Sequence, residues 1–372
     1  METSNLETDL SLFKYDTLEQ LPAAYRDLTE AERTKRIESA LDALGDDVIV
    51  LGHNYQRREI VEHADFIGDS YELSKRAAAA DADYVVFCGV TFMAESADII
   101  TDDDQTVILP SMEASCPMAG MAEALQVDAA WSELTAATDD DIVPITYMNS
   151  YADLKAFCAD QGGLVCTSSN AADAFEYAFD RGDTVLFLPD KHLGYNTAHE
   201  LGVEQTAEWD PWDAEGADAE AVVDADVILW EGYCQVHERF SEEHVEAIRE
   251  SHDDANVVVH PECRREVVEA ADVVGSTSTI CETIAEADAG DTWAIGTEIH
   301  LTRHLDRWHP EVEVVPLCGD ACMDCNAMRQ VDPNYLTWIL EELVESREHN
   351  VIEVDPQEKE LAELALNRML EI

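Results

Sequence analysis

Three short stretches decide the fold of this chain: VIVLGHNY at 48–55, IVPITYMN at 142–149 and NVVVHPE at 256–262. Each is a brief, β-branched apolar run that ends in polar or ionisable side chains, and such runs are typical of buried parallel strands. Each is followed by a helical stretch and a second apolar run that ends in small or hydroxyl-bearing residues: YVVFCGVT at 84–91, GLVCTSSN at 163–170 and VVGSTST at 273–279. The sequence therefore contains one α/β unit three times.

The spacing of the units is that of whole domains. Their marker residues His53, Tyr147 and His260 lie 94 and 113 residues apart, and periods of this length indicate repeated domains rather than solenoid units. The longer second interval contains WDPWDAEGADAEAVV at 209–223, which we expect to be an acidic insertion carried on a loop near 205–222.

The segments between these runs have helical patterns. QRREIVEHADFIGD at 56–69 is predicted as helix and turn, and SYELSKRAAAA at 70–80 as a helix that either Asp69 or Ser70 caps. After Cys325, NYLTWILEELVES at 334–346 and LAELALNRML at 361–370 predict two further helices.

Strands that alternate with helices predict parallel sheets covered by helices. We expect an α/β protein of three similar three-layer domains around a shared site at a pseudo-threefold centre. The predicted boundaries are an N-terminal helical segment at 1–45, domains at 46–125, 126–235 and 236–325, and C-terminal helices at 326–372.

The charge of the chain is its compositional outlier. The 372 residues include 22 Lys or Arg and 81 Asp or Glu, which gives a formal net charge of −59. The acidic residues are spread along the chain instead of forming long runs, a pattern that favours a protein soluble in concentrated salt, where self-repulsion is screened. We therefore expect a halophilic protein without a nucleic-acid partner, because phosphates would be repelled.

The sequence shows no targeting or membrane signal. METSNLETDLSLFKYD at 1–16 lacks the basic and apolar regions of a signal peptide, and no window reaches the apolar length of a membrane span. In such a chain, ten cysteines argue for metal or redox chemistry rather than a disulfide framework. We expect a soluble cytoplasmic protein with no membrane partner.

Polar side chains collect where the predicted strands end, which is where parallel α/β folds bind ligands. The residues at these positions are His53, Tyr55, Tyr147, Asn149, Ser168, His260 and Thr277. Each unit also reaches a cysteine near its end: Cys116, Cys234 or Cys325. Three thiols from three units indicate an iron–sulfur cluster, and three protein ligands would leave one iron open to act as a Lewis acid.

The segment PLCGDACMDCNAM at 316–328 leaves two alternatives open. Cys318, Cys322 and Cys325 would form a zinc site if a fourth ligand came from elsewhere. Their C-x3-C-x2-C spacing is also that of radical enzymes that use S-adenosylmethionine, although that motif belongs near the start of a β/α barrel. The remaining cysteines in apolar settings, Cys88, Cys158 and Cys166, are predicted to be buried small hydrophobes.

Eleven segments, in order, resemble the quinolinate synthase family. They are HNYQ (53–56), DFIGDS (65–70), FCGVTFMAES (87–96), ASCPMA (114–119), YMNS (147–150), CTSSNA (166–171), PDKHLG (189–194), WEGYCQVHE (230–238), HPEC (260–263), GSTSTI (275–280) and CNAM (325–328). The resemblance implies three α/β domains in a triangle, each giving one cysteine to a central [4Fe-4S] cluster. It also implies condensation of iminoaspartate with dihydroxyacetone phosphate to quinolinate, phosphate and water for NAD biosynthesis, with possible coupling to the aspartate-oxidising enzyme that makes iminoaspartate.

The resemblance carries over to individual positions. The cluster ligands would be Cys116, Cys234 and Cys325, the last in the C-x-x-M position of the family ligand. The substrate-binding residues would be His53, Ser70, Tyr147, Asn149, Ser168, His260, Glu262 and Thr277. Glu262 would be the general base, with Tyr55 and His260 as further catalytic groups. Some family members have upstream cysteines capable of disulfide chemistry, and Cys318 and Cys322 depart from their C-x2-C-x2-C spacing.

Two other classes of function remain at this point. A non-catalytic cluster protein could act as a redox or iron sensor, although a sensor needs no pocket of histidines, tyrosines and a carboxylate. A zinc-stabilised binding module would be colourless and contain stoichiometric zinc.

Overall fold

The computed structural model describes residues 21–102, 104–213, 218–252 and 254–372. None of the helices in these ranges is both long enough and apolar enough to span a membrane. The predicted helical segment at 1–45 lies partly outside this range. Its described part contains α1 (Glu30–Leu44). Thr29 and Glu32 form a capping box at the N-terminus of this helix.

The first domain is built on a four-stranded parallel sheet in the order β2-β1-β3-β4. Its strands are β1 (Val48–His53), β2 (Phe66–Gly68), β3 (Tyr84–Cys88) and β4 (Thr106–Ile108). Its helices are α2 (Arg58–Val61), α3 (Ser70–Ala78) and α4 (Thr91–Ile100).

The second domain has a five-stranded parallel sheet in the order β6-β5-β7-β9-β8. Its strands are β5 (Ile142–Tyr147), β6 (Leu164–Cys166), β7 (Thr184–Leu188), β8 (Thr206–Trp209) and β9 (Val227–Trp230). Its helices are α5 (Ala124–Ala137), α6 (Ala152–Asp160), α7 (Ala171–Phe179), α8 (Lys191–Glu200) and α9 (Ala219–Val222).

The third domain repeats the plan of the first, with strand order β11-β10-β12-β13. Its strands are β10 (Asn256–Val259), β11 (Val273–Val274), β12 (Thr292–Gly296) and β13 (Glu313–Pro316). Its helices are α10 (Glu242–Ser251), α11 (Arg265–Ala270), α12 (Thr277–Glu286) and α13 (Ile299–Trp308).

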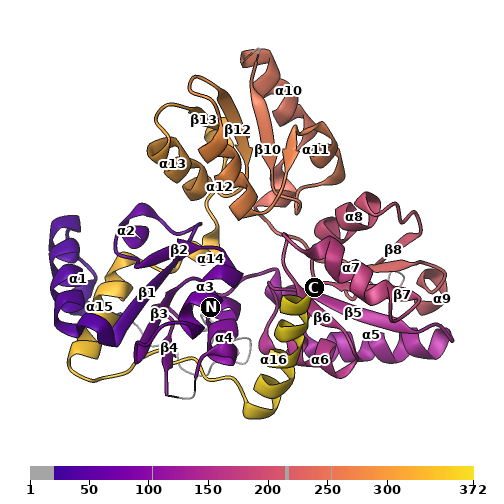
Figure 1. Ribbon diagram of the computed structural model, residues 1–372, viewed down its shortest axis with the longest axis horizontal. Coiled ribbons are helices and arrows are strands. Elements are labelled where there is room, and N and C mark those ends of the chain that lie inside the picture. The colour runs from indigo at the N-terminus through magenta and orange to yellow at the C-terminus, as the bar shows by residue number, and fades with distance from the viewer. Residues whose placement is uncertain (1–20, 103, 214–217, 253) are drawn as a thin grey trace, which may run out of the picture.

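The three sheets share one topology, which confirms the predicted fold class. In each, the first strand of the unit lies between the second and the third, and every strand pair is parallel. Figure 1 shows the domains at the corners of a triangle, the first in indigo and purple, the second in magenta and the third in orange. Parallel strands buried under helices explain why the leading runs are continuously apolar.

The C-terminal helices return to the first two domains. After α14 (Asn326–Arg329), α15 (Pro333–Val344) packs against α1, and α16 (Pro356–Glu371) packs against α6 and β6 (Figure 1). One continuous hydrophobic core therefore includes Phe87 of the first domain, Phe175 of the second, and Leu340 and Leu366 of the tail. The third domain has two core clusters of its own, around β10 and β12.

Three local predictions were wrong. The run at 84–91, predicted as the counterpart of those at 163–170 and 273–279, forms the third strand β3, whereas those two contain the second strands β6 and β11. The stretch at 56–69 contains strand β2 as well as helix, because Phe66–Gly68 pairs with the end of β1 across a sheet edge that local pattern does not show. The insertion near 205–222 is not only loop. Thr206–Trp209 forms edge strand β8 on β9, and Asp218 caps the short helix α9 by accepting from the N–H of Glu220.

Candidate functional site

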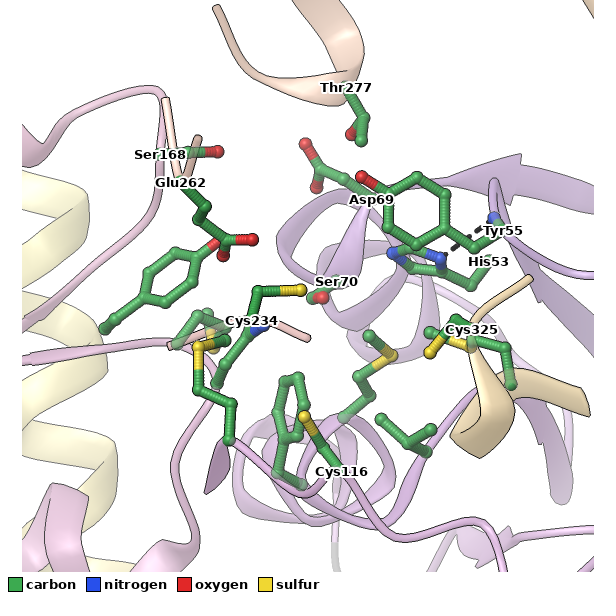
Figure 2. Close-up of a pocket in the computed structure, with 18 of the residues that line it drawn as sticks. His53, Tyr55, Asp69, Ser70, Cys116, Ser168, Cys234, Glu262, Thr277 and Cys325 are labelled. Atoms are coloured by element: carbon green, nitrogen blue, oxygen red, sulfur yellow. Dashed lines mark hydrogen bonds between the residues drawn. The ribbon is translucent and has the colours of Figure 1, made fainter. Parts of the chain in front are cut away.

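Three cysteines, one from each unit, line a single pocket at the centre of the triangle. Cys116 follows β4, Cys234 follows β9 and Cys325 follows β13, and each of these strands lies beside the third strand of its unit, β3, β7 or β12. Figure 2 shows their side chains around one space, together with residues from all three domains. The carboxyl ends of the strands thus meet where the sequence predicted a shared site.

Backbone N–H groups point at each of these thiols. Every sulfur accepts from residues two or three positions further on: Met118 and Ala119 for Cys116, His237 for Cys234, and Ala327 and Met328 for Cys325. Burial raises the pKa of Cys116 to about 12 and that of Cys325 to about 11, while these hydrogen bonds favour the thiolate. Since metals bind thiolates, the N–H groups offset part of the cost of deprotonating a buried thiol.

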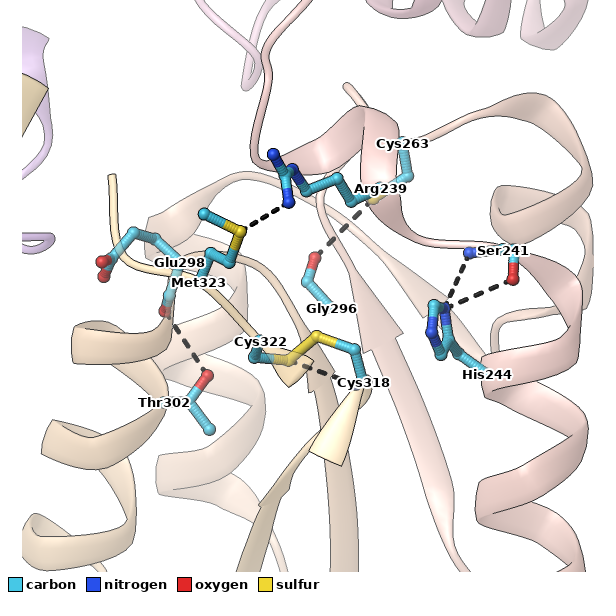
Figure 3. Close-up of a disulfide and its surroundings, with 10 residues drawn as sticks. All are labelled: Arg239, Ser241, His244, Cys263, Gly296, Glu298, Thr302, Cys318, Cys322 and Met323. Atoms are coloured by element: carbon cyan, nitrogen blue, oxygen red, sulfur yellow. Dashed lines mark hydrogen bonds between the residues drawn. A yellow bond between two sulfur atoms is a disulfide. The ribbon is translucent and has the colours of Figure 1, made fainter. Parts of the chain in front are cut away.

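Two fully buried carboxylates hold the backbone of two of the cysteines. Oδ2 of Asp190 accepts from the N–H of Cys234 at 3.0 Å, and Oε1 of Glu298 accepts from the N–H of Cys325 at 3.1 Å. Each carboxylate also caps the helix that follows its strand, Asp190 for α8 and Glu298 for α13. Figure 3 shows Glu298 beside the start of α13. The cysteine loops are therefore fixed to rigid strand–helix junctions.

His53 and His260 occupy matching places in the first and third domains, directly after β1 and β10. Nδ1 of His53 accepts from the N–H of Tyr55 at 3.1 Å, and Nδ1 of His260 accepts from the N–H of Glu262 at 3.3 Å. Both rings are therefore neutral with the proton on Nε2. Burial lowers the pKa of each to about 3, so the two imidazoles are uncharged hydrogen-bond donors at neutral pH.

We expect these histidines to make stability depend on pH. Their pKa in the folded protein is about 3, below the ordinary 6.5. Below pH 6.5 the unfolded chain therefore binds protons that the folded protein does not. Their contribution to the free energy of unfolding is complete above pH 6.5 and is lost as pH falls toward 3. The loss is about 1.4 kcal/mol per pH unit for each group. Chemical unfolding between pH 7 and 5 measures how the free energy of unfolding changes with pH. This dependence should be shallower in His53→Gln than in wild type, by that amount.

The control for this experiment is His199→Gln, which removes an exposed ring. This variant should keep the wild-type slope. Equal slopes for wild type and His53→Gln would contradict a buried neutral imidazole at position 53.

Glu262 is the carboxylate of the pocket, and it is almost fully buried. Its Oε2 accepts from Nδ1 of His237 at 2.5 Å, and it also accepts from the hydroxyl of Tyr147. Burial alone would raise the pKa of Glu262, but His260, His237 and Tyr147 together lower it to about 2. Its Oε1 has no partner among the described residues, so an ionised oxygen is left for a ligand.

A line of hydrogen bonds joins Glu262 to Tyr55. Nε2 of His237 lies 3.0 Å from Oγ1 of Thr297, which lies 2.7 Å from the hydroxyl of Tyr55. Burial raises the pKa of Tyr55 well above 10, so this tyrosine is protonated and can donate. With His237 donating from Nδ1, the order of donation runs Tyr55, Thr297, His237, Glu262.

Hydroxyl groups enter the pocket at helix N-termini. Ser70 and Thr277 are the first residues of α3 and α12, and Ser168 lies just before α7. Asp69, not Ser70, caps α3, since its Oδ1 accepts from the N–H groups of Tyr71 and Glu72. The hydroxyl of Ser70 therefore does not serve as the cap, and helix N-termini favour anions.

All the predicted site residues line this pocket: His53, Tyr55, Ser70, Cys116, Tyr147, Asn149, Ser168, Cys234, His260, Glu262, Thr277 and Cys325. The sequence analysis did not single out His237, Thr297, Asp190 and Glu298. Three of them had a signal in the sequence. WEGYCQVHE contains His237 and PDKHLG contains Asp190, and both segments already resembled the family. GTEIH, which contains Glu298, follows a strand as the other site segments do.

The cysteine-rich segment after β13 does not form a three-thiol site. Cys318 and Cys322 are joined in a disulfide (Figure 3), which leaves Cys325 alone of the three to face the pocket. Cys88, Cys158 and Cys166 are fully buried, as predicted. A different group could hold a metal ion: ligand atoms of Cys234, His237 and Glu262 lie within 4.8 Å of one another.

This arrangement can bind an anionic molecule without positive side chains, hold metal through thiolates and move protons through a buried carboxylate and tyrosines. Residues 35–371 match the family described as "Quinolinate synthetase A protein". The chain is 80% identical to a quinolinate synthase of Haloarcula marismortui and 77% identical to one of Halobacterium salinarum, over the full length of each. It is 48% identical to a quinolinate synthase of Acidobacterium capsulatum, over 94% of this chain and 95% of that one.

Proposed function

This chain belongs to the quinolinate synthetase A family of enzymes of NAD biosynthesis, and we propose that it condenses iminoaspartate with dihydroxyacetone phosphate to form quinolinate, phosphate and water. We further propose a [4Fe-4S] cluster held by Cys116, Cys234 and Cys325, and an iron-dependent enzyme that works in the cytoplasm of a halophile. The observation that carries the proposal is that one thiol from each domain lines the same pocket as Glu262 and two neutral histidines.

The donor set fits such a cluster. Three thiols with N–H groups directed at their sulfurs are the ligands that iron–sulfur clusters use, and hydrogen bonds to sulfur are a common feature of these sites. When bound, a cluster with three protein ligands supplies an open iron that can act as a Lewis acid on a departing hydroxyl. The residues of this chain supply binding, orientation and proton transfer.

Substrate binding in this pocket depends on neutral donors. Both proposed substrates are anions, and the chain has a net charge of −59. Nε2–H of His53 and of His260 can donate to carboxylate or phosphate oxygens, and Ser70 and Thr277 add hydroxyls at helix N-termini. Because His53, His260 and Thr277 are buried in a pocket between the domains, these groups act where little water competes.

Proton transfer is assigned to Glu262. Its lowered pKa keeps it ionised, and its unpartnered Oε1 can accept a proton from a substrate carbon or nitrogen. Tyr147 and His237 hold the other oxygen in place. While Glu262 accepts one proton from the substrate, the protonated hydroxyl of Tyr55, which lines the same pocket, can donate another to it.

The direct test is anaerobic purification in high salt, followed by metal analysis and a quinolinate assay. We expect a brown protein with about four irons and four sulfides per chain that forms quinolinate from the two substrates. Colourless protein with stoichiometric zinc would instead support the site at Cys234, His237 and Glu262. A full cluster without quinolinate formation would support a sensor and overturn the proposed reaction.

A further inference from the structure

A groove between the first and third domains concentrates positive charge in a strongly acidic chain. It has a cavity volume of about 520 Å³ and is lined by five arginines. These come from α2 and the residue before it, from α13 and from α14: Arg57, Arg58, Arg303, Arg307 and Arg329. The chain has only 22 Lys and Arg against 81 Asp and Glu, so this grouping departs sharply from its surroundings.

Carboxylates at or beside the groove pair with four of its five arginines, since Arg57 pairs with Asp332 and Arg329 with Asp324. Glu59 and Asp324 are the acidic residues of its lining. Arg58 and Arg307 share one carboxylate, that of Glu62, at 2.6 and 3.5 Å. Three carboxylates, those of Asp332, Glu62 and Asp324, thus serve four arginines, and Arg303 adds a fifth positive charge.

Arg303 stands out among these arginines. No ion pair or hydrogen bond of its guanidinium is found among the described residues, and its side chain is exposed at the groove. It lies between His300 and Arg307 along α13, so residues 300, 303, 304 and 307 share one face of the helix. Its guanidinium remains available to an external anion.

The chemistry of the lining selects the class of ligand. A guanidinium presents N–H groups in a planar fork that matches phosphate oxygens, and several forks around one cavity favour an anion with more than one charge. In concentrated salt, simple attraction between charges is screened within a few ångströms. Only a ligand that makes several hydrogen bonds at once would compete with chloride there.

Two segments, residues 55–57 and 324–329, line the groove on one side and the central pocket on the other. Arg57 lies two residues after Tyr55, and its Nη2 donates to the carbonyl oxygen of Arg329 at 2.5 Å, within the helix that begins after Cys325. On the other side, Nδ1 of His300 lies 2.8 Å from Glu298, which accepts from the N–H of Cys325. An anion in the groove would therefore contact the segments that carry Tyr55 and Cys325.

We propose that this arginine groove is a second anion site, which binds a small phosphate-bearing molecule with at least two negative charges. The site lies outside the central pocket and does not depend on turnover. Its occupation is linked to the Cys325 loop, and by thermodynamic reciprocity a change at that loop alters the affinity for the anion.

The test is calorimetric titration of inorganic pyrophosphate into the anaerobically purified protein at constant ionic strength in KCl. We expect saturable binding of one pyrophosphate per chain. Arg303→Gln should weaken it about tenfold, the effect of losing one charge-assisted hydrogen bond. Arg307→Gln should also weaken pyrophosphate binding. Agreement between the two variants would show that the loss does not come from a folding defect in one of them.

The matched control is Arg249→Gln, an exposed arginine paired with Asp272 on another face of the third domain. It should bind pyrophosphate as wild type does. Equal weakening in Arg249→Gln would mean a general charge effect and would overturn the proposal. So would wild-type affinity in Arg303→Gln, which would place the anion in the central pocket, or the absence of saturable binding, which would leave chloride as the only occupant.

Discussion

Cys234→Ala is expected to abolish both the cluster and quinolinate formation. Cys234 lines the pocket with Cys116 and Cys325, and among the described residues of the second domain it is the only cysteine that does so. Two remaining thiolates cannot hold a four-iron cluster in the same way, and without it the departing hydroxyl loses its Lewis acid. We expect colourless protein after anaerobic purification, with iron near background and no detectable turnover.

The control is Cys281→Ala, which removes a partly buried thiol that does not line the pocket. That variant should keep the colour, the iron content and the activity of wild type. A brown, active Cys234→Ala protein would rule out the ligand assignment. Circular dichroism of both variants, compared with wild type, tells loss of the cluster apart from loss of the fold.

Glu262→Gln is expected to lower kcat by a factor of about 10² to 10⁴, the usual contribution of a general base. The amide keeps an oxygen that can accept from His237 and Tyr147, so the local geometry is preserved while the base is lost. Cluster content should stay at the wild-type level, because Glu262 is not among the three proposed thiol ligands. Steady-state kinetics and iron analysis on one preparation measure both quantities.

Glu341→Gln provides the comparison for this variant. Glu341 pairs with Arg36 where α15 packs against α1, away from the pocket, and its replacement should leave kcat unchanged. If Glu262→Gln kept wild-type kcat, another group would have to be the base. If it lost its iron instead, Glu262 would hold metal, as its position beside Cys234 and His237 allows.

The parts of the fold that the sequence predicts well are those that local pattern determines. The runs at 48–55, 142–149 and 256–262 are buried, β-branched and short, and each forms the inner strand of a sheet. The polar residues after them line the pocket, because parallel strands present their carboxyl ends at one edge. Strands β2 and β8 form by pairing at a sheet edge, and both escaped prediction because their own stretches, FIG and TAEW, hold too little apolar sequence between polar residues to indicate a strand.

The positioning carboxylates were hidden by composition. Among 81 acidic residues, composition does not set Asp190 and Glu298 apart, and the one local signal is their place directly after a strand, in PDKHLG and GTEIH. Only the fold brings Asp190 beside Cys234, 44 residues away, and Glu298 beside Cys325, 27 residues away. Likewise, His237 and Thr297 meet only because the third strand of the third domain ends next to the loop that follows β9.

The return of the tail to the first two domains has a consequence for the order in which the protein is made. A growing chain contains all three pocket thiols only once Cys325 has been made, so a cluster held by the three can form only after the third domain has been synthesised. Helices α15 and α16 follow all three domains in the chain, yet they complete the core that the first and second domains share. Although domains generally fold in order during synthesis, here the sheets of the first two domains keep part of their apolar surface uncovered until these helices have been made.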